Sequence, residues 1–290
     1  MQIDVKNLTF NYGQNSKATS SVALDNISLT INEGEFFGII GHTGSGKSTF
    51  VQHLNGLIKL NKNSGEIKIG EFDLGDKNCD FKALRSKLGM VFQYPEYQLF
   101  AETVFEDVAF GIKNFMPTVT EEEKEKMVRS ALETVGLNYE RVKDMSPFEL
   151  SGGQKRRVAI AGVIVTKPEV LVLDEPVAGL DPVGKRDFIA LLKKLHASFV
   201  KTIILVSHDM DLVADNCTQV AVFAKGKIAK VGSPEEVFGD YEEIKNMGLD
   251  LPLTAYLKNQ LEKQGVKIGG KLSVEEFINA VKSYGKGGKV

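Results

Sequence analysis

Residues 41–48 read Gly-His-Thr-Gly-Ser-Gly-Lys-Ser, the full pattern of a phosphate-binding loop. An apolar run, residues 35–40, comes directly before them, and a helix-compatible run from Ser48 to Ile58 follows. In that setting the glycines let backbone N–H groups turn toward phosphate oxygens, and the next helix points its positive dipole end at them. The alternative is an ordinary glycine-rich turn, but the order strand, loop, helix favours a phosphate site.

The loop and the residue after it are therefore expected to hold the nucleotide. Lys47 should reach the β- and γ-phosphates, and the Ser48 hydroxyl should bind Mg²⁺. The expected ATP-binding residues of this segment are Gly41, His42, Thr43, Gly44, Ser45, Gly46, Lys47, Ser48 and Thr49.

The composition restricts the class of protein. The 290 residues suit one large domain or one domain with a small appendage, and 42% apolar residues are enough for a sizeable core. A net charge of −2 gives no general attraction to nucleic acid. We expect no transmembrane segment, because no apolar run approaches the roughly 20 residues required, and no signal peptide. Cys79 and Cys217 are interpreted as ordinary reduced thiols.

Apolar runs without alternation predict a sheet that is buried on both faces. Residues 170–173 and 202–206 are such runs, and residues 183–198 between them have a helical pattern. Strands that alternate with helices favour parallel pairing. Further strands are expected at residues 3–10, 22–31, 64–70, 88–92, 218–224 and 227–231, with a polar loop at 11–21.

Residues 103–165 have helical rather than strand character. Thr120 and Glu123 form a capping-box pattern at the start of one helix. The buried stripe of that helix is expected at Met127, Ala131 and Val135.

The tail after residue 232 is rich in Lys, Glu and Gly. Ser273 and Glu276 form another capping pattern, so we predict a small helical extension. Residues 285–289 are expected to be frayed.

A second chemical element follows the apolar strand 170–173, which ends in Asp174 and Glu175. Asp174 suits the Mg²⁺ shell. Glu175 suits polarisation of an attacking water, because hydrolysis in phosphate-loop proteins depends mainly on positioning and charge stabilisation. Alone, two carboxylates at a strand end are a weak signal, but together with the phosphate loop they become a strong one.

A third element, Leu150-Ser151-Gly152-Gly153-Gln154, leads into a predicted helix. A serine and two glycines at a helix N-terminus form a second anion site, although a flexible capping turn has the same composition. One nucleotide does not need two phosphate cradles, so Ser151, Gly152, Gly153 and Gln154 are expected to act on the nucleotide of a partner.

Leu-Ser-Gly-Gly-Gln between a phosphate loop and an Asp-Glu strand resembles the signature of the ATP-binding-cassette (ABC) ATPases. The resemblance covers about residues 2–232. It implies an α/β fold: a P-loop NTPase core of ABC-ATPase type with a β subdomain, a helical signature lobe at about 95–165, and a small helical C-terminal extension. We therefore predict an ABC ATP-binding domain at 1–232 and the extension at 233–290.

The same resemblance assigns four further residues. Tyr12 looks like the aromatic residue that stacks on adenine, although a strand-edge aromatic is the ordinary alternative. Gln93 looks like the glutamine that senses Mg²⁺ and the attacking water. Asp181 matches the loop that crosses the interface between paired subunits. His208 matches the histidine that contacts the γ-phosphate. The implied cofactors are ATP and Mg²⁺, with Ser48, Gln93 and Asp174 at the metal and Glu175, His208 and Gln93 as catalytic residues.

Two longer segments narrow the resemblance. Residues 91–100, Val-Phe-Gln-Tyr-Pro-Glu-Tyr-Gln-Leu-Phe, and residues 146–162 around the signature look like the second ATPase of energy-coupling-factor (ECF) transporters. This implies a peripheral ATPase on the cytoplasmic face of the cell membrane. Its implied partners are a second, different ABC ATPase, a transmembrane coupling protein and exchangeable substrate-binding membrane subunits that take up vitamins or other micronutrients. No nucleic-acid partner is expected.

A surface for the membrane partner is expected near Gln93. Acidic residues interleaved with aromatic ones suit a groove for a basic amphipathic helix, although a solvated acidic face over core aromatics is the ordinary alternative. The residues concerned are Glu96, Glu102, Glu106, Asp107, Phe100, Phe105 and Phe110. The basic run 155–157 is interpreted as a solvated helix face rather than a nucleic-acid patch.

Two other functional classes of protein fit these motifs less well. A soluble ABC ATPase of DNA repair would interrupt the cassette with long coiled coils, and no sustained heptads are present. Translation-type members usually carry two cassettes, whereas this chain has one. A P-loop kinase or GTPase-like switch has no place for residues 150–154. Co-purification with a membrane protein, DNA or ribosomes would separate these classes.

Overall fold

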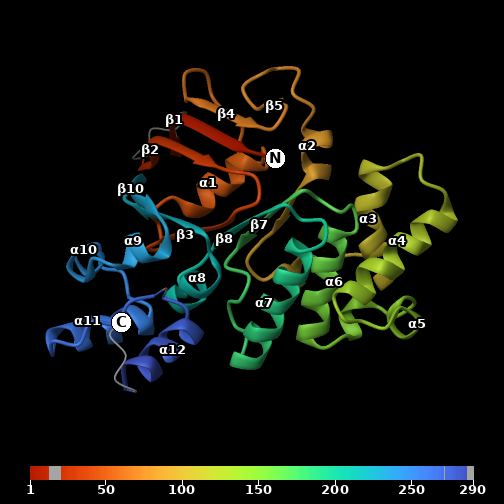
Figure 1. Ribbon diagram of the computed structural model, residues 1–290. Helices are drawn as coiled ribbons and strands as arrows, with labels where there is room; N and C mark the ends of the chain where they lie inside the picture. Colours follow the sequence, from red (N-terminus) through yellow and green to blue (C-terminus); the bar gives the residue numbers. More distant parts are fainter. Residues whose placement is uncertain (13–20, 271, 286–290) are drawn as a thin grey trace. The chain divides into compact units, whose positions relative to one another are not determined.

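The computed structural model describes residues 1–12, 21–270 and 272–285, and its course is shown in Figure 1. The expected polar loop at 11–21 therefore lies largely outside the described residues, as does most of the segment 285–289. Internal contacts divide the chain into two compact units. The first comprises residues 1, 51–59 and 69–203, and the second comprises residues 2–50, 60–68 and 204–290.

The second unit contains an antiparallel sheet in which β1 lies between β2 and β4. In the pairing of β1 with β2, Ile3 lies opposite Ile31, and Val5 lies opposite Leu29. Three residues of β1 are buried, Ile3, Val5 and Leu8, and the alternation is interrupted between Val5 and Leu8, where the pairing shifts register. The bounds are β1 (Ile3–Tyr12), β2 (Ser21–Ile31) and β4 (Glu66–Ile69).

The same unit contains strands in the order β10-β9-β3-β8. β3 is parallel to β9, and β10 is antiparallel to β9. All residues of β3 are buried, which explains why its sequence does not alternate. The bounds are β3 (Phe36–Gly41), β8 (Thr202–Val206), β9 (Gln219–Ala224) and β10 (Lys227–Gly232).

In the described part of the second unit, one helix lies between β8 and β9, and four more follow β10, where a small helical extension was expected. Aspartates of the first helix bind the backbone starts of two others: Asp211 accepts from Leu253 N at 2.7 Å, and Asp215 accepts from Val274 N at 2.9 Å. The helices are α8 (Met210–Asn216), α9 (Pro234–Phe238), α10 (Tyr241–Asn246), α11 (Leu253–Lys263) and α12 (Val274–Gly285).

The first unit contains the order β8-β7-β6, because the boundary between the units runs through β8. β6 and β7 are parallel, with Leu88 opposite Val170 and Val91 opposite Leu173. The predicted parallel sheet is thus confirmed. The bounds are β5 (Phe72–Asp73), α2 (Phe81–Lys87), β6 (Leu88–Val91), β7 (Val170–Asp174) and α7 (Pro182–His196), while α1 (Lys47–Leu54) spans both units.

A group of helices in the first unit accounts for the predicted helical stretch. α3 and α6 approach closely, since a Cβ added at Gly111 of α3 would lie 3.2 Å from the carbonyl oxygen of Gly162 in α6. Figure 1 shows both beside α4. The bounds are η1 (Pro95–Gln98), α3 (Val104–Phe115), α4 (Glu121–Thr134), α5 (Tyr139–Val142), η2 (Pro147–Glu149) and α6 (Gly152–Ile164).

The capping box predicted at the start of α4 is present, but its buried stripe differs in part. Ala131 and Val135 are buried as expected, whereas Met127 is only half-buried. Val128 and Leu132 fill that face of the helix instead.

The two cysteines are free thiols, Cys79 half-buried and Cys217 buried. Burial raises the pKa of the Cys217 thiol. Among the helices of the described residues, none combines the length and the apolar character that crossing a membrane requires.

Candidate nucleotide-binding site

The phosphate loop lies in the second unit, between the end of β3 and the start of α1. Its glycines take left-handed backbone conformations, with φ of +79° at Gly44 and +105° at Gly46. A Cβ at Gly46 would lie 2.5 Å from the carbonyl oxygen of Ala23, whereas a Cβ at Gly44 would meet no atom within 4 Å. The loop is thus tightly held from behind and open at Gly44, as a cradle for phosphate must be.

Lys47 is buried within this loop. Its Nζ donates to the carbonyl oxygens of Gly41 at 2.7 Å and His42 at 2.9 Å. The Ser45 hydroxyl oxygen is also buried and has no hydrogen-bond partner among the described residues. A buried cation beside a buried hydroxyl suits a phosphate group, so this chain's own residues fit a nucleotide.

Tyr12, at the end of β1, lies next to this loop. Its hydroxyl is 3.2 Å from the Thr49 hydroxyl, and its ring packs edge-on against Phe10 with centroids 4.9 Å apart. The side chain of Tyr12 is still 47% exposed. An exposed ring fixed beside the phosphate loop is free to stack on a base.

His42 has a contact that the sequence did not indicate. Its Nε2 lies 3.0 Å from the carbonyl oxygen of Met247, directly after α10. A Cβ at Gly248 would lie only 2.7 Å from the same nitrogen. The tail therefore contacts the phosphate loop within the second unit.

His208 follows β8, and the phosphate loop follows the neighbouring strand β3. Ser207 N donates to the carbonyl oxygen of Ile39 at 3.1 Å, which fixes the start of the histidine segment beside β3. His208 is exposed, and the next residue, Asp209, caps α8 by accepting from Leu212 N at 3.1 Å. His208 and the phosphate loop thus emerge from the carboxyl ends of adjacent strands, where ligands bind in open α/β sheets.

In the first unit, Gln93 and the Asp174–Glu175 pair come from neighbouring strands. Gln93 follows β6, and Asp174 is the last residue of β7, which is parallel to β6. Gln93 is exposed and Asp174 is buried. Their strands deliver all three side chains to one edge of the sheet.

Glu175 has an unusual backbone. Its φ is +49°, in the left-handed region that non-glycine residues seldom occupy. The turn is closed by a hydrogen bond from Ala178 N to the carbonyl oxygen of Glu175 at 3.2 Å. Such strain occurs at functional sites more often than elsewhere, and no local sequence pattern indicates it here.

The predicted signature segment forms the N-terminus of α6. Ser151 is the N-cap, its hydroxyl accepts from Gln154 N at 3.4 Å, and the Gln154 side chain accepts from Ser151 N at 3.0 Å. A Cβ added at Gly152 or Gly153 would meet no atom within 4 Å. The described part of the first unit leaves these glycines uncovered.

Asp181 caps α7, which begins at Pro182. Its Oδ1 accepts from Gly184 N at 2.7 Å. The Asp-Pro pair is a recognisable start signal for a helix, and it marks the start of α7 in the sequence.

Two expectations for charged residues were wrong in part. Asp107 is buried and accepts from the backbone N–H groups of Phe100 and Ala101 at 2.9 and 3.0 Å, so it does not face a partner. Glu96 is engaged with Arg156 at 3.0 Å. Arg156, in the run interpreted as a solvated face, is only 5% exposed.

Two of the expected groove aromatics are nevertheless exposed. Phe100 is 60% exposed and Phe110 is 49% exposed, and their rings pack edge-on with centroids 4.9 Å apart. They line a cavity of about 390 Å³ together with Leu57, Arg85, Phe92 and Phe115, among others. Glu102 and Glu106 are exposed nearby in the chain, while Phe105 is half-buried.

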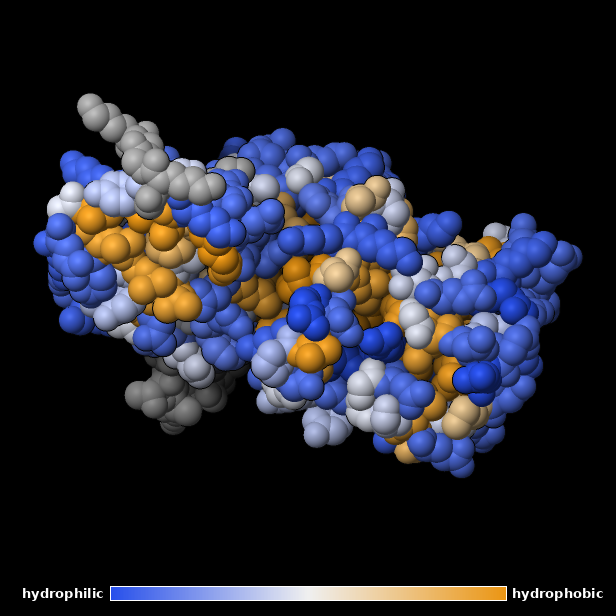
Figure 2. Space-filling view, turned by 60° about the horizontal axis from the view of Figure 1, so that its bottom comes forward, coloured by the Kyte–Doolittle hydropathy of each residue, from blue (hydrophilic) through white to orange (hydrophobic). Residues whose placement is uncertain are grey.

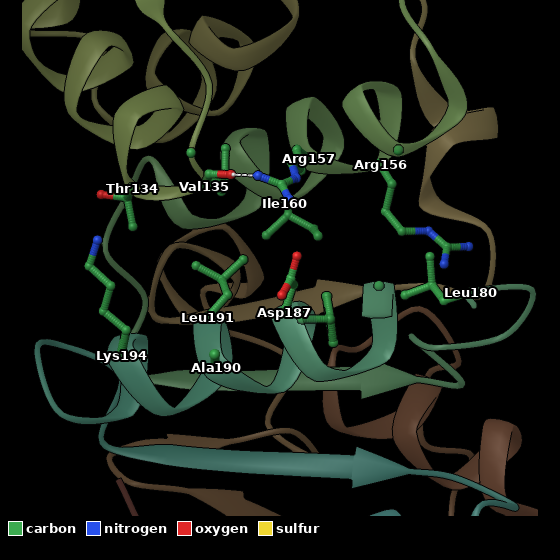
Figure 3. Close-up of a pocket in the computed structure, with 14 residues that line it drawn as sticks. Thr134, Val135, Arg156, Arg157, Ile160, Leu180, Asp187, Ala190, Leu191 and Lys194 are labelled. Atoms are coloured by element: carbon green, nitrogen blue, oxygen red, sulfur yellow. Dashed lines mark hydrogen bonds between the residues drawn. The ribbon is translucent and has the colours of Figure 1, made fainter. Parts of the chain in front are cut away.

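A further cavity of about 410 Å³ lies between α6 and α7 (Figure 3). Its lining is mainly apolar, with Ile160 on one side and Leu191 on the other, and Lys194 at one end. Of the residues predicted to act on nucleotide, Gly153 is the one that lines it. The Arg157 Nη1 donates to the carbonyl oxygen of Val135 at 3.0 Å beside this cavity.

The predicted site residues thus fall into two groups, one in each unit. The second unit holds Tyr12, residues 41–49 and His208. The first unit holds Gln93, Asp174, Glu175, residues 151–154 and Asp181.

Comparisons with known proteins show the family of this chain. A sequence model of the ABC transporter family matches residues 24–178. The energy-coupling factor transporter ATP-binding protein EcfA2 of Clostridium tetani is 49% identical over 268 residues, covering 92% of this chain and 91% of that protein. EcfA2 of Caldanaerobacter subterraneus subsp. tengcongensis is 46% identical over 290 residues, covering 100% of this chain and 99% of that protein.

Solved structures of ABC proteins are also similar to this chain. CbiO1 of Clostridium perfringens, described as part of the ABC transporter complex cbiONQ, is 39% identical with a TM-score of 0.72, covering 89% of this chain and 98% of that chain. The ATP-binding cassette MJ0796, solved as a dimer bound to ADP and Pi, is 31% identical with a TM-score of 0.70, covering 80% of this chain and 98% of that chain. This chain therefore belongs to the ABC transporter family and, within it, to the ATP-binding proteins of energy-coupling factor transporters.

Proposed function

We propose that the chain hydrolyses ATP to drive an ECF-type importer, using Tyr12 and residues 41–49 to hold the nucleotide. The observation that carries this proposal is the phosphate loop: an open cradle at Gly44, with Lys47 and the Ser45 hydroxyl buried behind it. A similar cassette bound to ADP and Pi supports hydrolysis as its chemistry.

We assign the residues that take part in hydrolysis from their positions in the family motifs. Ser48, Gln93 and Asp174 would hold Mg²⁺ directly or through water, and the ion would neutralise charge that develops on the phosphates. Glu175 polarises the attacking water, and His208 steadies the γ-phosphate. The backbone of Glu175, with φ of +49° directly after β7, supports this role, because strained conformations of this kind cluster at functional sites.

Ser151, Gly152, Gly153 and Gln154 would act on the nucleotide of a second subunit, together with Asp181. The support is the uncovered N-terminus of α6, whose backbone N–H groups and dipole attract an anion from outside the chain. The two paired subunits would then close around the γ-phosphate only when ATP is bound, and hydrolysis would let them separate again.

The partner subunit is expected to be a second, different ABC ATPase, and the tail would contribute to the pairing. The helices α11 and α12 carry exposed apolar side chains, and Figure 2 shows hydrophobic residues gathered over this part of the chain, on the left of the view. Such a patch is typical of a protein–protein contact. The side chains are Leu253, Tyr256, Leu257, Val274, Ile278, Val281 and Tyr284.

A membrane coupling protein would bind at the aromatic groove, with Phe100 and Phe110 as apolar anchors. Glu102 and Glu106 remain available for its basic residues, whereas Glu96 and Asp107 do not. The chain would thus be a peripheral protein at the cytoplasmic face. Vitamins or other micronutrients would enter through exchangeable substrate-binding membrane subunits.

Replacement of the proposed water-polarising carboxylate tests the function. In the purified transporter complex, Glu175→Gln should bind ATP and pair as the unaltered chain does, but should lose turnover by about 10²–10⁴-fold. Glu133→Gln removes an exposed carboxylate of α4 and should leave turnover unchanged. Sustained hydrolysis by the Glu175→Gln complex would refute the assignment.

A further inference from the structure

Arg156 is a buried cation whose hydrogen bonds converge on two separate segments. Its Nε donates to Glu96 Oε2 and its Nη2 donates to Glu96 Oε1, both at 3.0 Å, so the ion pair is bidentate. The side chains are only 6% and 18% exposed. A guanidinium this deep must satisfy its remaining N–H groups within the protein.

Those remaining groups bind the backbone that follows Glu175. Nη1 and Nη2 both donate to the carbonyl oxygen of Ala178 at 3.1 Å, and Nη1 also approaches the carbonyl oxygen of Pro176 at 3.4 Å. Figure 3 shows Arg156 directed from α6 toward the segment that carries Leu180, while Arg157 is directed toward Val135. The two neighbouring arginines therefore fasten different parts of the first unit.

The segment that Arg156 holds begins at the strained residue of the proposed site. Glu175 has its φ at +49°, and such a conformation persists only where the surroundings fix it. The turn has two hydrogen bonds of its own, Ala178 N to the Glu175 carbonyl oxygen and Leu180 N to the Val177 carbonyl oxygen. Arg156 binds the carbonyl oxygens of Pro176 and Ala178, which neither of these two hydrogen bonds uses, so it adds to the fixation of the turn.

Helix packing alone does not explain the buried ion pair between Arg156 and Glu96. A buried ion pair contributes little net stability compared with apolar side chains of similar volume, so a helix contact at this place did not require it. The guanidinium instead supplies several donors at fixed angles, which suits the orientation of a backbone segment.

We propose that Arg156 is a positioning residue for ATP hydrolysis. It holds the Pro176–Ala178 turn and, through it, the direction of the Glu175 carboxylate and the start of α7 at Asp181. Glu96, three residues after Gln93, orients the Arg156 guanidinium in turn. The inference rests on the proposed function, because it assigns Arg156 an effect on the hydrolytic carboxylate.

Steady-state ATP hydrolysis by the purified transporter complex tests this inference. Arg156→Lys keeps the charge but loses the bidentate fork, and Glu96→Gln removes the charge that orients it. Because neither variant alters Tyr12 or residues 41–49, KM for ATP should stay within about 2-fold, while kcat should fall by about 10- to 100-fold, as for a misplaced catalytic group. Arg157→Lys is the matched control and should keep kcat within about 3-fold, because Arg157 binds Val135 instead.

A second readout does not depend on catalysis. Amide hydrogen exchange of Ala178 and Leu180 should accelerate in Arg156→Lys and Glu96→Gln but not in Arg157→Lys, while the thermal unfolding midpoint shows that each variant is folded. Unchanged exchange at Ala178 and Leu180, or an unchanged kcat in a folded Arg156→Lys complex, would overturn the positioning role. If the unaltered complex itself failed to hydrolyse ATP, the proposed function would fall, and accelerated exchange would still show that Arg156 holds the turn.

Discussion

At the scale of single residues, the glycines of the two predicted phosphate-binding segments differ in their surroundings. Gly46 is enclosed, with a virtual Cβ 2.5 Å from the carbonyl oxygen of Ala23, and its φ is +105°. Gly153 lies in the first turn of α6 with open space around its Cβ position. Only the first glycine is therefore required by the fold of this chain.

Replacement of Gly153 by alanine should affect the stability of the chain and the turnover of the complex in opposite directions. Gly153→Ala should stabilise the purified chain by up to about 1 kcal/mol in urea unfolding, because it restricts the unfolded chain and fits a helix. It should leave the chain's own affinity for ATP unchanged and still lower the turnover of the complex, because the added methyl group would obstruct a partner's phosphate.

Gly46→Ala is the matched comparison. Its Cβ would collide with backbone, so it should lower both the stability of the chain and its affinity for ATP. Unimpaired turnover of a Gly153→Ala complex would contradict the assignment of α6 to a partner's nucleotide.

At the scale of elements, patterns formed by residues close together in the sequence predicted the structure correctly. The capping box at Thr120 and the strand, loop and helix around residues 41–48 depend on residues within one turn of each other. The Arg156–Glu96 pair joins residues 60 positions apart, so no local pattern reveals it. Asp107 likewise looked like a surface carboxylate because its backbone partners lie in a loop before α3.

The start of α4 gives a pH-dependent prediction. Hydrogen bonds from the backbone N–H and then from the hydroxyl of Thr120 hold the pKa of the Glu123 carboxyl below its usual value. A carboxyl whose pKa is lower in the folded state stabilises the fold above its unfolded pKa, and this contribution is lost as pH falls through the folded pKa. Glu123→Gln should therefore lower the urea midpoint at pH 7 and have a vanishing effect in acid.

The control for this prediction is Glu122→Gln, which removes an exposed carboxylate of the same turn without affecting the capping box. If the difference in urea midpoint between Glu123→Gln and the unaltered chain grew toward low pH, the prediction would be wrong.

At the scale of the whole molecule, family motifs predicted more than physical patterns did. The EcfA2 relatives match as much as 100% of this chain, so the tail is part of what they share with it. The division into a cassette at 1–232 and an extension at 233–290 remains a prediction, because the compact units are cut elsewhere and join the tail to the phosphate loop. The contact of His42 with Met247 has no counterpart in the sequence pattern, since 205 residues separate the two.

Capture of this protein from detergent-solubilised membranes of its host, with the bound chains identified by mass, tests whether it is the ATPase of a transporter. A second cassette ATPase and one polytopic membrane protein should be recovered with it. Phe110→Ala, which removes an exposed groove aromatic, should lose the membrane protein and retain the second ATPase. Recovery of this chain alone, or with ribosomal or DNA-associated proteins, would contradict the account of a transport motor.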